Sequence, residues 1–358
     1  MAGRALRLQW RPFAFALPRA LVTAHGAVQE RRGWLLRLED GDGRVGWGEA
    51  APLDQQPEAL GPRDDHDALA TVICQLGAHQ EWQTLDEALP QLPGPLAFAI
   101  GAALAELDGL VGGPAGWLAA PRSALLLPAG RAALPALERA LHHDMLQSVS
   151  NYPAANLVGN HVSKAEPPLP SPPFTVKWKV ATGDDREERD LLETLLKRLP
   201  AGSRLRLDAN CGWRRPEAIA WAERLAAEPA LEWLEQPLPT DDLEGLEHLA
   251  RLLPVALDES LAQQPVLRQR WKGWQVRRPA LEGDPRPLLA DLQRGSPHLM
   301  VSTAFETGIG RRWLEHLAAL QLRGPTPTAP GLAQGWCPPG ELFVADPQRV
   351  WQGARCSR

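Results

Sequence analysis

The chain has 358 residues, a formal net charge of −5 and scattered basic residues, which argues against nucleic-acid and membrane-surface partners. Its length suits a β/α barrel of about 250 residues with a smaller second domain, and it lacks the run of about 18 apolar residues that a membrane span requires. Its four cysteines are widely spaced, so we expect reduced thiols in a cytoplasmic protein rather than a disulfide framework or a zinc site.

The first fifty residues have the pattern of β-strands. Alternating or apolar runs with strand character lie at 6–10, 33–38 and 45–49. The last two flank a turn sequence, Glu-Asp-Gly-Asp-Gly, at 39–43, which predicts a hairpin. From about 64 to 112 the pattern becomes helical. Strands followed by helices predict a small α+β domain over 1–115, to which we also assign the tail from about 335.

After about residue 122, short apolar runs alternate with helical segments. Eight runs are candidate strands: 124–127, 174–180, 204–208, 231–235, 255–258, 273–277, 298–302 and a weak one near 320–323. Helical segments between them include 186–198, 215–227 and 243–253. This alternation predicts an α/β fold with a parallel sheet, most economically a closed β/α barrel over 116–334. A doubly wound open sheet is the alternative.

One segment, 144–173, breaks this rhythm. It contains the chain's single tyrosine and a proline-rich stretch, and it lies between a helix expected to end near His143 and the next strand. A loop of this length is uncommon within a barrel. We interpret it as a mobile insertion in the barrel domain.

Lysine is rare in this chain, with 5 lysines against 33 arginines, yet two of them lie two residues apart in the run Val-Lys-Trp-Lys-Val at 176–180. Burial lowers the pKa of a lysine enough for it to act as a base, whereas arginine stays protonated. Residues two apart on a strand share a face, so we expect Lys177 and Lys179 to point into one space and Trp178 to point away. The alternative is an edge strand with solvated charges.

Three successive apolar runs end in an acid, namely Asp208, Glu235 and Asp258. The spacings of 27 and 23 residues each match about one β/α unit, so parallel strands bring the three side chains to the C-terminal mouth of a barrel. Carboxylates within a few Å of one another repel unless a cation neutralises them, and oxygen ligands favour Mg²⁺. The alternative is that each acid only caps the next helix.

A metal ion beside two lysines implies a division of roles. The ion holds a substrate carboxylate and stabilises the negative charge that forms when the α-proton leaves. Neutral Lys179 takes that proton, and both Lys177 and the ion lower its pKa. The sequence therefore predicts an enzyme that acts on a small-molecule carboxylate.

In these features the chain resembles the enolase superfamily, in particular its muconate-lactonizing branch, whose members pair a lysine base with Mg²⁺. The resemblance covers nearly the whole chain except 144–173. It rests on Lys-Trp-Lys at 177–179, Leu-Asp-Ala-Asn at 207–210, Leu-Glu-Gln-Pro-Leu at 234–238, Leu-Asp-Glu-Ser-Leu at 257–261, Gly-Trp-Gly-Glu-Ala-Ala-Pro-Leu at 46–53 and Ser-Thr-Ala-Phe-Glu-Thr-Gly at 302–308. It implies a modified TIM barrel with an N-terminal α+β capping domain. It also implies Mg²⁺, with Mn²⁺ as a substitute, on Asp208, Glu235 and Asp258.

The resemblance further implies a carbon–oxygen lyase that eliminates water from 2-succinyl-6-hydroxy-2,4-cyclohexadiene-1-carboxylate in menaquinone or phylloquinone synthesis. Lys179 is implied as the base that then acts as the acid, and Lys177 as the residue that tunes it and contacts the carboxylate. Implied substrate contacts are Arg206, Ser302, Thr303 and, from a loop of the capping domain, His25. A surface-loop role for His25 is an equal alternative, and no obligate protein partner is implied.

One position departs from the family pattern. Where the family has a lysine on the sixth barrel strand before a proline, this chain has Arg278, preceded by Arg277. The guanidinium can stack over an enolate, but it does not deprotonate and cannot be a base. A racemase needs a base on each face of the α-carbon, whereas a dehydration on one face needs only Lys179. Which of the two arginines faces inward stays open at this stage.

Three alternatives remain. An isomerase of the same superfamily, namely an N-succinylamino-acid racemase, a dipeptide epimerase or a muconate cycloisomerase, shares the metal and lysine pattern. A barrel glycosidase using two of the acids leaves the lysines and the third acid unexplained. A catalytically decayed relative would retain the fold without activity.

Overall fold

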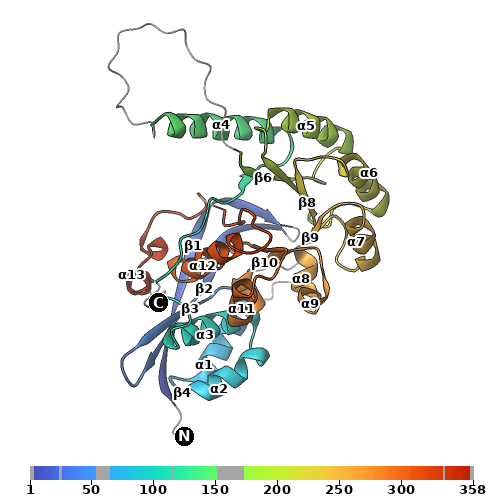
Figure 1. The fold of residues 1–358 in the computed structure, drawn as a ribbon. Coiled ribbons are helices and arrows are strands. Elements are labelled where there is room, and N and C mark those ends of the chain that lie inside the picture. The colour runs from blue at the N-terminus through green and yellow to red at the C-terminus, as the bar shows by residue number, and fades with distance from the viewer. Residues whose placement is uncertain are drawn as a thin grey trace, which may run out of the picture. The chain divides into compact units, whose positions relative to one another are not determined.

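The computed structural model of the protein describes residues 4–23, 26–53, 65–113, 116–150, 173–333 and 335–354 (Figure 1). Its contacts divide the chain into two compact units. One is Ala124–Gln263, and the other is discontinuous, Met1–Ser123 with Gln264–Arg358. This division falls within the predicted barrel, so the domain limits at 115 and 334 stay predictions.

The discontinuous unit begins with a four-stranded antiparallel sheet in the order β3-β2-β1-β4. Its strands are β1 (Ala5–Thr23), β2 (Gly26–Asp40), β3 (Val45–Ala50) and β4 (His79–Glu81). The three predicted strand runs and the hairpin between β2 and β3 are confirmed. β1 is far longer than its predicted run because it pairs with β2 from Leu6, opposite Asp40, to Thr23, opposite Gly26.

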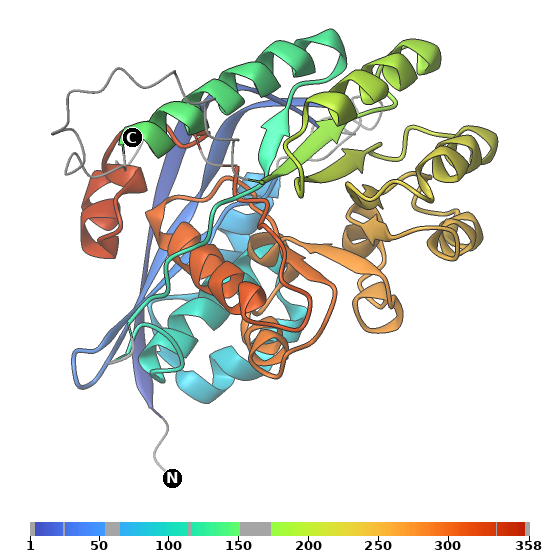
Figure 2. The same cartoon turned by 45° about the horizontal axis from the view of Figure 1, so that its top comes forward.

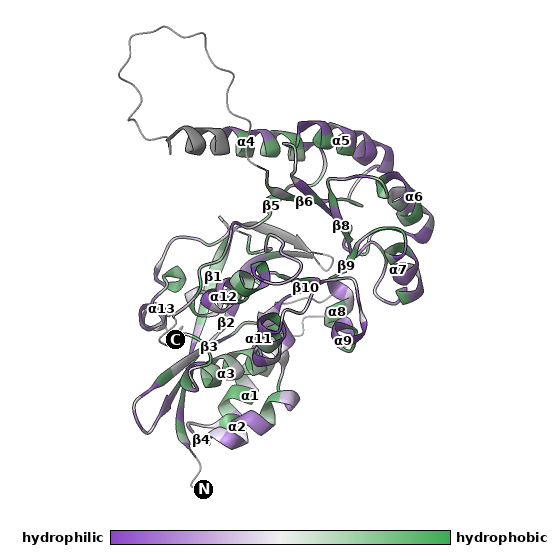
Figure 3. Cartoon of the chain, in the orientation of Figure 1, coloured by the Kyte–Doolittle hydropathy of each residue, from purple (hydrophilic) through white to green (hydrophobic). Residues whose placement is uncertain are grey.

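Three helices belong to this part of the chain: α1 (Asp65–Leu76), which precedes β4, and α2 (Trp82–Ala88) and α3 (Gly94–Leu107), which follow it. Every residue of α3 from 96 to 105 is buried, and Figure 3 shows the helix in the colours of apolar residues. Two glycines of β3 allow this helix to lie directly on the sheet. A Cβ on Gly46 would lie 2.0 Å from the Ala103 carbonyl oxygen, and a Cβ on Gly48 would lie 2.0 Å from the Ala99 oxygen.

Gly48→Ala is expected to destabilise the protein by about 3 kcal/mol, because the new methyl group must push α3 away from β3. Urea unfolding followed by circular dichroism measures the loss. Gly41→Ala is the matched control, since a Cβ at that position meets nothing within 4 Å. Equal losses in the two variants would contradict the close approach.

The C-terminal part of this unit contains the parallel pair β10 (Trp274–Arg277) and β11 (Leu299–Val301). Its helices are α9 (Leu267–Arg270), α10 (Pro279–Glu282), α11 (Arg286–Gln293), α12 (Gly308–Leu322) and α13 (Pro347–Gly353). The weak strand predicted near 320–323 is wrong, because α12 continues through this run and buries leucines at helical spacing. Gly331 instead forms an isolated parallel bridge with Ser302.

The described part of the C-terminal tail packs on the antiparallel sheet. Trp351 of α13 lies against Trp47 of β3, with 5.7 Å between ring centroids, in an apolar cluster that also contains Phe13 and Leu35. The guanidinium of Arg11 lies 4.7 Å from the centroid of Trp351. These contacts tie the end of the chain to its first strands.

The second unit has five parallel strands, each paired with the next along the chain. They are β5 (Leu125–Leu127), β6 (Thr175–Lys179), β7 (Arg204–Asp208), β8 (Leu231–Glu235) and β9 (Val255–Leu257). The helices between and after them, seen in Figure 2, are α4 (Ala133–Ser150), α5 (Asp185–Arg198), α6 (Arg215–Leu225), α7 (Leu243–Ala250) and α8 (Glu259–Gln263). The predicted alternation is confirmed. Since these five strands keep their sequence order, the doubly wound alternative is wrong for this unit.

The helix before the predicted insertion is longer than expected. α4 runs to Ser150 rather than ending near His143, so the first residues of the 144–173 segment are helical. The remainder of that segment, 151–172, lies outside the described residues. In the part of the chain that the structure describes, no helix has the length and apolar character needed to cross a bilayer.

Candidate active site

The two lysines of β6 lie where the sequence pattern predicts. β6 is paired on both sides, with β5 and with β7, so the alternative of an edge strand is wrong. Val176 and Trp178 are fully buried, while Lys177 and Lys179 are partly accessible on the alternate positions. In register, Lys177 lies opposite Arg206 and Lys179 opposite Asp208. Both amines therefore belong to the face that carries the first acid.

The three acids follow one another at the ends of neighbouring strands. Asp208 lies directly opposite Glu235, and Glu235 lies opposite Ala256, two residues before Asp258. All three are buried, with Glu235 wholly inaccessible. The Lys177 ammonium joins two of them, because its Nζ lies 2.8 Å from Asp208 Oδ2 and 2.5 Å from Glu235 Oε1.

Backbone strain marks the turns after these strands. Four residues that are not glycine have positive φ there: Ala181 (59°), Asn210 (43°), Cys211 (64°) and Gln236 (38°). Such conformations cost of order 1 kcal/mol or more and persist only where the surroundings fix them, which is common at functional sites. The strain therefore lies at the same strand ends as the acids.

The electrostatics of the site reflect excess negative charge. The pKa of Glu235 is raised to about 7, mainly by burial and also by the Asp208 and Asp258 carboxylates, although Lys177 opposes the shift. The pKa of Lys179 is lowered, first by burial and also by the neighbouring charge of Lys177, against the effect of Asp208. A buried amine with a lowered pKa is suited to act as a base.

The acids were expected to lie within a few Å of one another and to share a metal ion. Among the described residues, no three His, Cys, Asp or Glu side chains are close enough together to hold one. The Lys177 ammonium lies instead between Asp208 and Glu235, so the close cluster is not formed as the side chains stand. The assignment of the three acids as shared ligands stays a prediction.

The chemistry of the donors nevertheless fits a hard divalent cation. Buried carboxylate oxygens are the ligands that Mg²⁺ prefers, and their mutual repulsion favours added positive charge. Two further buried oxygens beside them, Asn210 Oδ1 and Glu259 Oε2, have no hydrogen-bond partner. A cation or its bound water would satisfy such oxygens.

Three residues that flank the acids, Asn210, Gln236 and Glu259, were not predicted as site residues. Gln236 is fully buried, and its Oε1 accepts hydrogen bonds from the backbone amides of Asp258 (3.2 Å) and Ser260 (3.1 Å), which fixes the end of β9. Asn210 donates through Nδ2 to Glu259 Oε1 at 2.8 Å. Their signal was present, because all three stand in the motifs at 207–210, 234–238 and 257–261.

Arg206 is completely buried, but it has a partner that the sequence did not reveal. Its Nε lies 2.6 Å from Glu232 Oε2, and its guanidinium lies 4.1 Å from the centroid of the Trp233 ring. The pairing of β7 with β8 shifts register here, from Leu205 opposite Leu231 to Arg206 opposite Trp233. Glu232 is therefore the extra residue of a β-bulge. A substrate role for Arg206 stays a prediction.

The structure distinguishes the two arginines at the end of β10. Arg277 forms an ion pair with the partly buried Glu282, with 2.5 Å between Nη2 and Oε2. Arg278 instead donates through Nη1 to the carbonyl oxygen of Thr303, at 2.8 Å, beyond the end of β11. Of the two, Arg278 is the one that reaches a neighbouring strand end.

Ser302 and Thr303 follow β11 and are buried. The Ser302 hydroxyl lies 3.3 Å from the Gly331 carbonyl oxygen, and the Thr303 hydroxyl donates to Glu306 Oε2 at 2.5 Å. Both hydroxyls thus already have protein partners, and their predicted contacts with a substrate carboxylate stay predictions. His25 lies outside the described residues.

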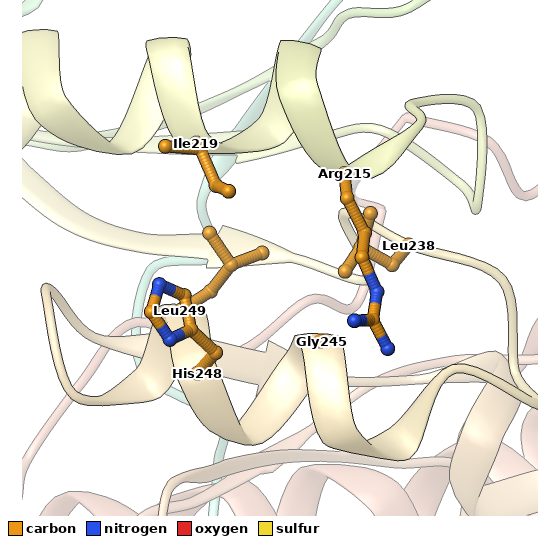
Figure 4. Close-up of a pocket in the computed structure, with 6 residues that line it drawn as sticks. All are labelled: Arg215, Ile219, Leu238, Gly245, His248 and Leu249. Carbon is orange, nitrogen blue, oxygen red and sulfur yellow. The ribbon is translucent and has the colours of Figure 1, made fainter.

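A cavity of about 180 Å³ lies between α6 and α7 (Figure 4). It is lined by Arg215, Ile219, Leu238, Gly245, His248 and Leu249. Arg215 is already paired with Asp242 and Glu244, at 2.5 and 2.9 Å. The cavity includes none of the predicted catalytic residues, and we do not assign the active site to it.

Comparison with known proteins gives consistent results. Residues 174–270 match the family model described as enolase C-terminal domain-like. The o-succinylbenzoate synthase of Thermosynechococcus vestitus is 34% identical over 87% of this chain and 88% of its own. The L-Ala-D/L-Glu epimerase of Bacillus subtilis is 27% identical over 72% of this chain and 67% of its own.

A solved structure extends this comparison to the fold. The o-succinylbenzoate synthase of Thermosynechococcus elongatus BP-1, complexed with Mg in the active site, matches with a TM-score of 0.71. The match covers 97% of this chain and 99% of that chain, at 31% identity. The predicted α/β class, with β/α repeats and an N-terminal α+β part, is confirmed.

Proposed function

Because this chain belongs to the enolase superfamily of enzymes, we propose that it is a Mg²⁺-dependent o-succinylbenzoate synthase. The observation that carries the proposal is the pair Lys177 and Lys179 on β6, in register with the acid that ends β7. The similarity to the Thermosynechococcus synthase supports this activity over others of the superfamily. The proposed substrate is 2-succinyl-6-hydroxy-2,4-cyclohexadiene-1-carboxylate, on the route to menaquinone or phylloquinone in the cytoplasm.

In this proposal Asp208, Glu235 and Asp258 hold Mg²⁺, with Mn²⁺ as a substitute. When bound, the ion stabilises negative charge on the substrate carboxylate. Lys179 Nζ accepts the proton from the ring carbon that bears this carboxylate, and the C–O bond to the ring hydroxyl then breaks. The same Nζ returns the proton to the departing hydroxide, which leaves as water. The ring becomes aromatic, so the elimination is strongly favoured.

Other residues keep supporting roles in the proposal. Lys177 neutralises the acids in the resting structure and contacts the substrate carboxylate when the ion is bound. Arg206, Ser302 and Thr303 are proposed to orient charged groups of the substrate, and Arg278 to stabilise the enolate. His25 is proposed as a contact from the capping domain.

The epimerase relative in Bacillus subtilis makes an isomerase the second candidate. Epimerisation requires a second base on the opposite face of the α-carbon. Arg278 occupies the position at which the family carries that lysine, and a guanidinium does not deprotonate in proteins. We therefore favour dehydration.

The proposed function predicts that purified protein with Mg²⁺ dehydrates the cyclohexadiene substrate, followed by the absorbance change on ring aromatisation. Incubation of N-succinylamino acids and dipeptides in D₂O serves as the parallel assay. We expect turnover in the first assay and no loss of chirality in the second. Isomerisation without dehydration would establish the second candidate, and inactivity in both would indicate a decayed relative.

A further inference from the structure

The turn after β11 is held in a strained conformation by a buried acid of its own. Phe305 has a φ of 64°, which is costly for a residue other than glycine. Its backbone amide donates to the Thr303 hydroxyl at 2.8 Å. Glu306 accepts from that hydroxyl at 2.5 Å and from the Ala304 amide at 2.6 Å. The turn is therefore closed by side chains on both sides of Phe305.

A second buried acid reaches this turn from the antiparallel sheet. Glu49, near the end of β3, accepts from the Thr307 amide at 2.9 Å, from the Thr307 hydroxyl at 2.5 Å and from the Gly310 amide at 3.0 Å. These donors include the N-terminal amides of α12, which need partners outside the helix. Glu49 and the turn are separated by more than 250 residues in sequence.

The local packing requires glycine at two positions in the first turn of α12. A Cβ on Gly310 would lie 2.9 Å from Glu49 Oε2, and a Cβ on Gly308 would lie 2.0 Å from the Val344 carbonyl oxygen. Gly310 thus allows the carboxylate to approach the first turn of α12, and Gly308 allows the backbone at Val344 to approach the same turn. It gives a structural reason for part of the motif at 302–308.

Burying the Glu49 carboxylate costs free energy. Its presence here indicates that the site needs a side chain that only accepts hydrogen bonds. Burial, together with the charge of Glu306, raises the pKa of Glu49 to about 7, although the hydrogen bonds from Thr307 and Gly310 oppose the shift. A glutamine could place its amide oxygen at the position of Oε2, but its amide nitrogen would then face the Thr307 amide, which donates to Oε1 of Glu49 at 3.0 Å, and two donors would oppose each other.

This turn also holds Arg278, the residue proposed to stabilise the enolate. The carbonyl oxygen of Thr303 accepts from Arg278 Nη1 at 2.8 Å. The orientation of this carbonyl depends on the strained turn that Glu306 and Glu49 fix. A chain of hydrogen bonds therefore runs from the antiparallel sheet through the turn to the guanidinium.

We infer that Glu49 is a positioning residue, which acts through the turn at 303–307 to hold the Arg278 guanidinium for a negatively charged substrate. The inference rests on the proposed function, since it assigns Arg278 to the anionic substrate and its enolate. Glu49 itself does not touch the substrate in this account.

The test combines Glu49→Gln with Arg278→Gln in a double-mutant cycle. We expect Glu49→Gln to raise KM for the cyclohexadiene substrate and to lower kcat/KM at least about tenfold, because a displaced guanidinium interacts less with the anionic substrate and with its enolate. In the Arg278→Gln background, Glu49→Gln should add almost nothing, because the group through which it acts is gone. Independent effects that multiply in the double variant would overturn the inference.

Glu106→Gln is the matched control, because Glu106 is a largely buried acid that also contacts α12, through Arg312 and Trp313. We expect it to lower the melting temperature at least as much as Glu49→Gln while KM changes less than twofold. Hydrogen exchange of the amides at 304–310 should accelerate in Glu49→Gln and not in Glu106→Gln. Equal kinetic effects of the two variants, or unchanged exchange, would show that Glu49 is only a structural residue.

Two further measurements, on Thr307 variants and on the wild-type enzyme, complete the test. If Glu49→Gln does not fold, Thr307→Val removes the hydroxyl donor to Glu49 and should raise KM, while Thr307→Ser retains it and should not. An inactive wild-type enzyme would refute the proposed function. An active wild-type enzyme with unchanged KM in both Glu49→Gln and Thr307→Val would refute the positioning role alone.

Discussion

Lys179→Ala is expected to lower kcat for dehydration by about 10³-fold or more while the protein still folds and still binds Mg²⁺. Lys179 is a partly buried amine whose pKa is lowered mainly by burial, and it lies in register with Asp208. Lys177, the other lysine of the pair, cannot replace it directly, since its ammonium is paired with the carboxylates of Asp208 and Glu235. Stopped-flow or steady-state absorbance measures the loss.

The pH profile provides a second measurement on the same residue. Because the pKa of Lys179 is lowered, its neutral form is present at a lower pH than for an exposed lysine. We expect kcat/KM to rise with pH through this lowered pKa and then to level off. This rise of kcat/KM with pH should be absent from the residual activity of Lys179→Ala, because the titrating base is gone.

Lys197→Ala is the control, since Lys197 is an exposed lysine in the last turn of α5 within the same unit. It should leave kcat and the pH profile unchanged. Retention of more than about a tenth of the wild-type rate by Lys179→Ala would remove this residue from the role of base.

The strand ends were predictable because their signals are local. Asp208 and Glu235 close apolar runs, turn-forming residues follow them, and β7 and β8 end at these acids. The weak run at 320–323 lacked such an ending, and it is the last turn of α12, in which Leu320 is partly buried and Leu322 is exposed. An apolar run alone does not distinguish a short strand from the end of a buried helix.

Long-range partners were not predictable from one sequence. Nothing near Glu49 indicates that its carboxylate accepts hydrogen bonds from Thr307 and Gly310. The bulge that gives Arg206 its partner Glu232 is likewise a property of strand pairing rather than of the sequence pattern. The pair of arginines at the end of β10 could be resolved only by their contacts with Glu282 and Thr303.

Glu235→Gln is expected to weaken Mg²⁺ binding by at least about 100-fold and to abolish dehydration, because it removes the central acid of the three strand ends. Isothermal titration with MgCl₂ measures the affinity. Glu247→Gln is the control, since Glu247 is an exposed acid on α7 in the same unit. Equal affinities for wild type and Glu235→Gln would remove Glu235 from the ligand set.

The same residue links ion binding to pH. The pKa of Glu235 in the folded protein is raised to about 7 from an ordinary 4.5, so its contribution to stability is present below pH 4.5 and is lost as pH rises through about 7. A bound cation reverses this loss, because it favours the ionised carboxylate. Added Mg²⁺ should therefore raise the melting temperature more at pH 8 than at pH 5.5, and this difference should shrink in Glu235→Gln. A Mg²⁺ effect independent of pH would show that the ion, if it binds, does so without this carboxylate.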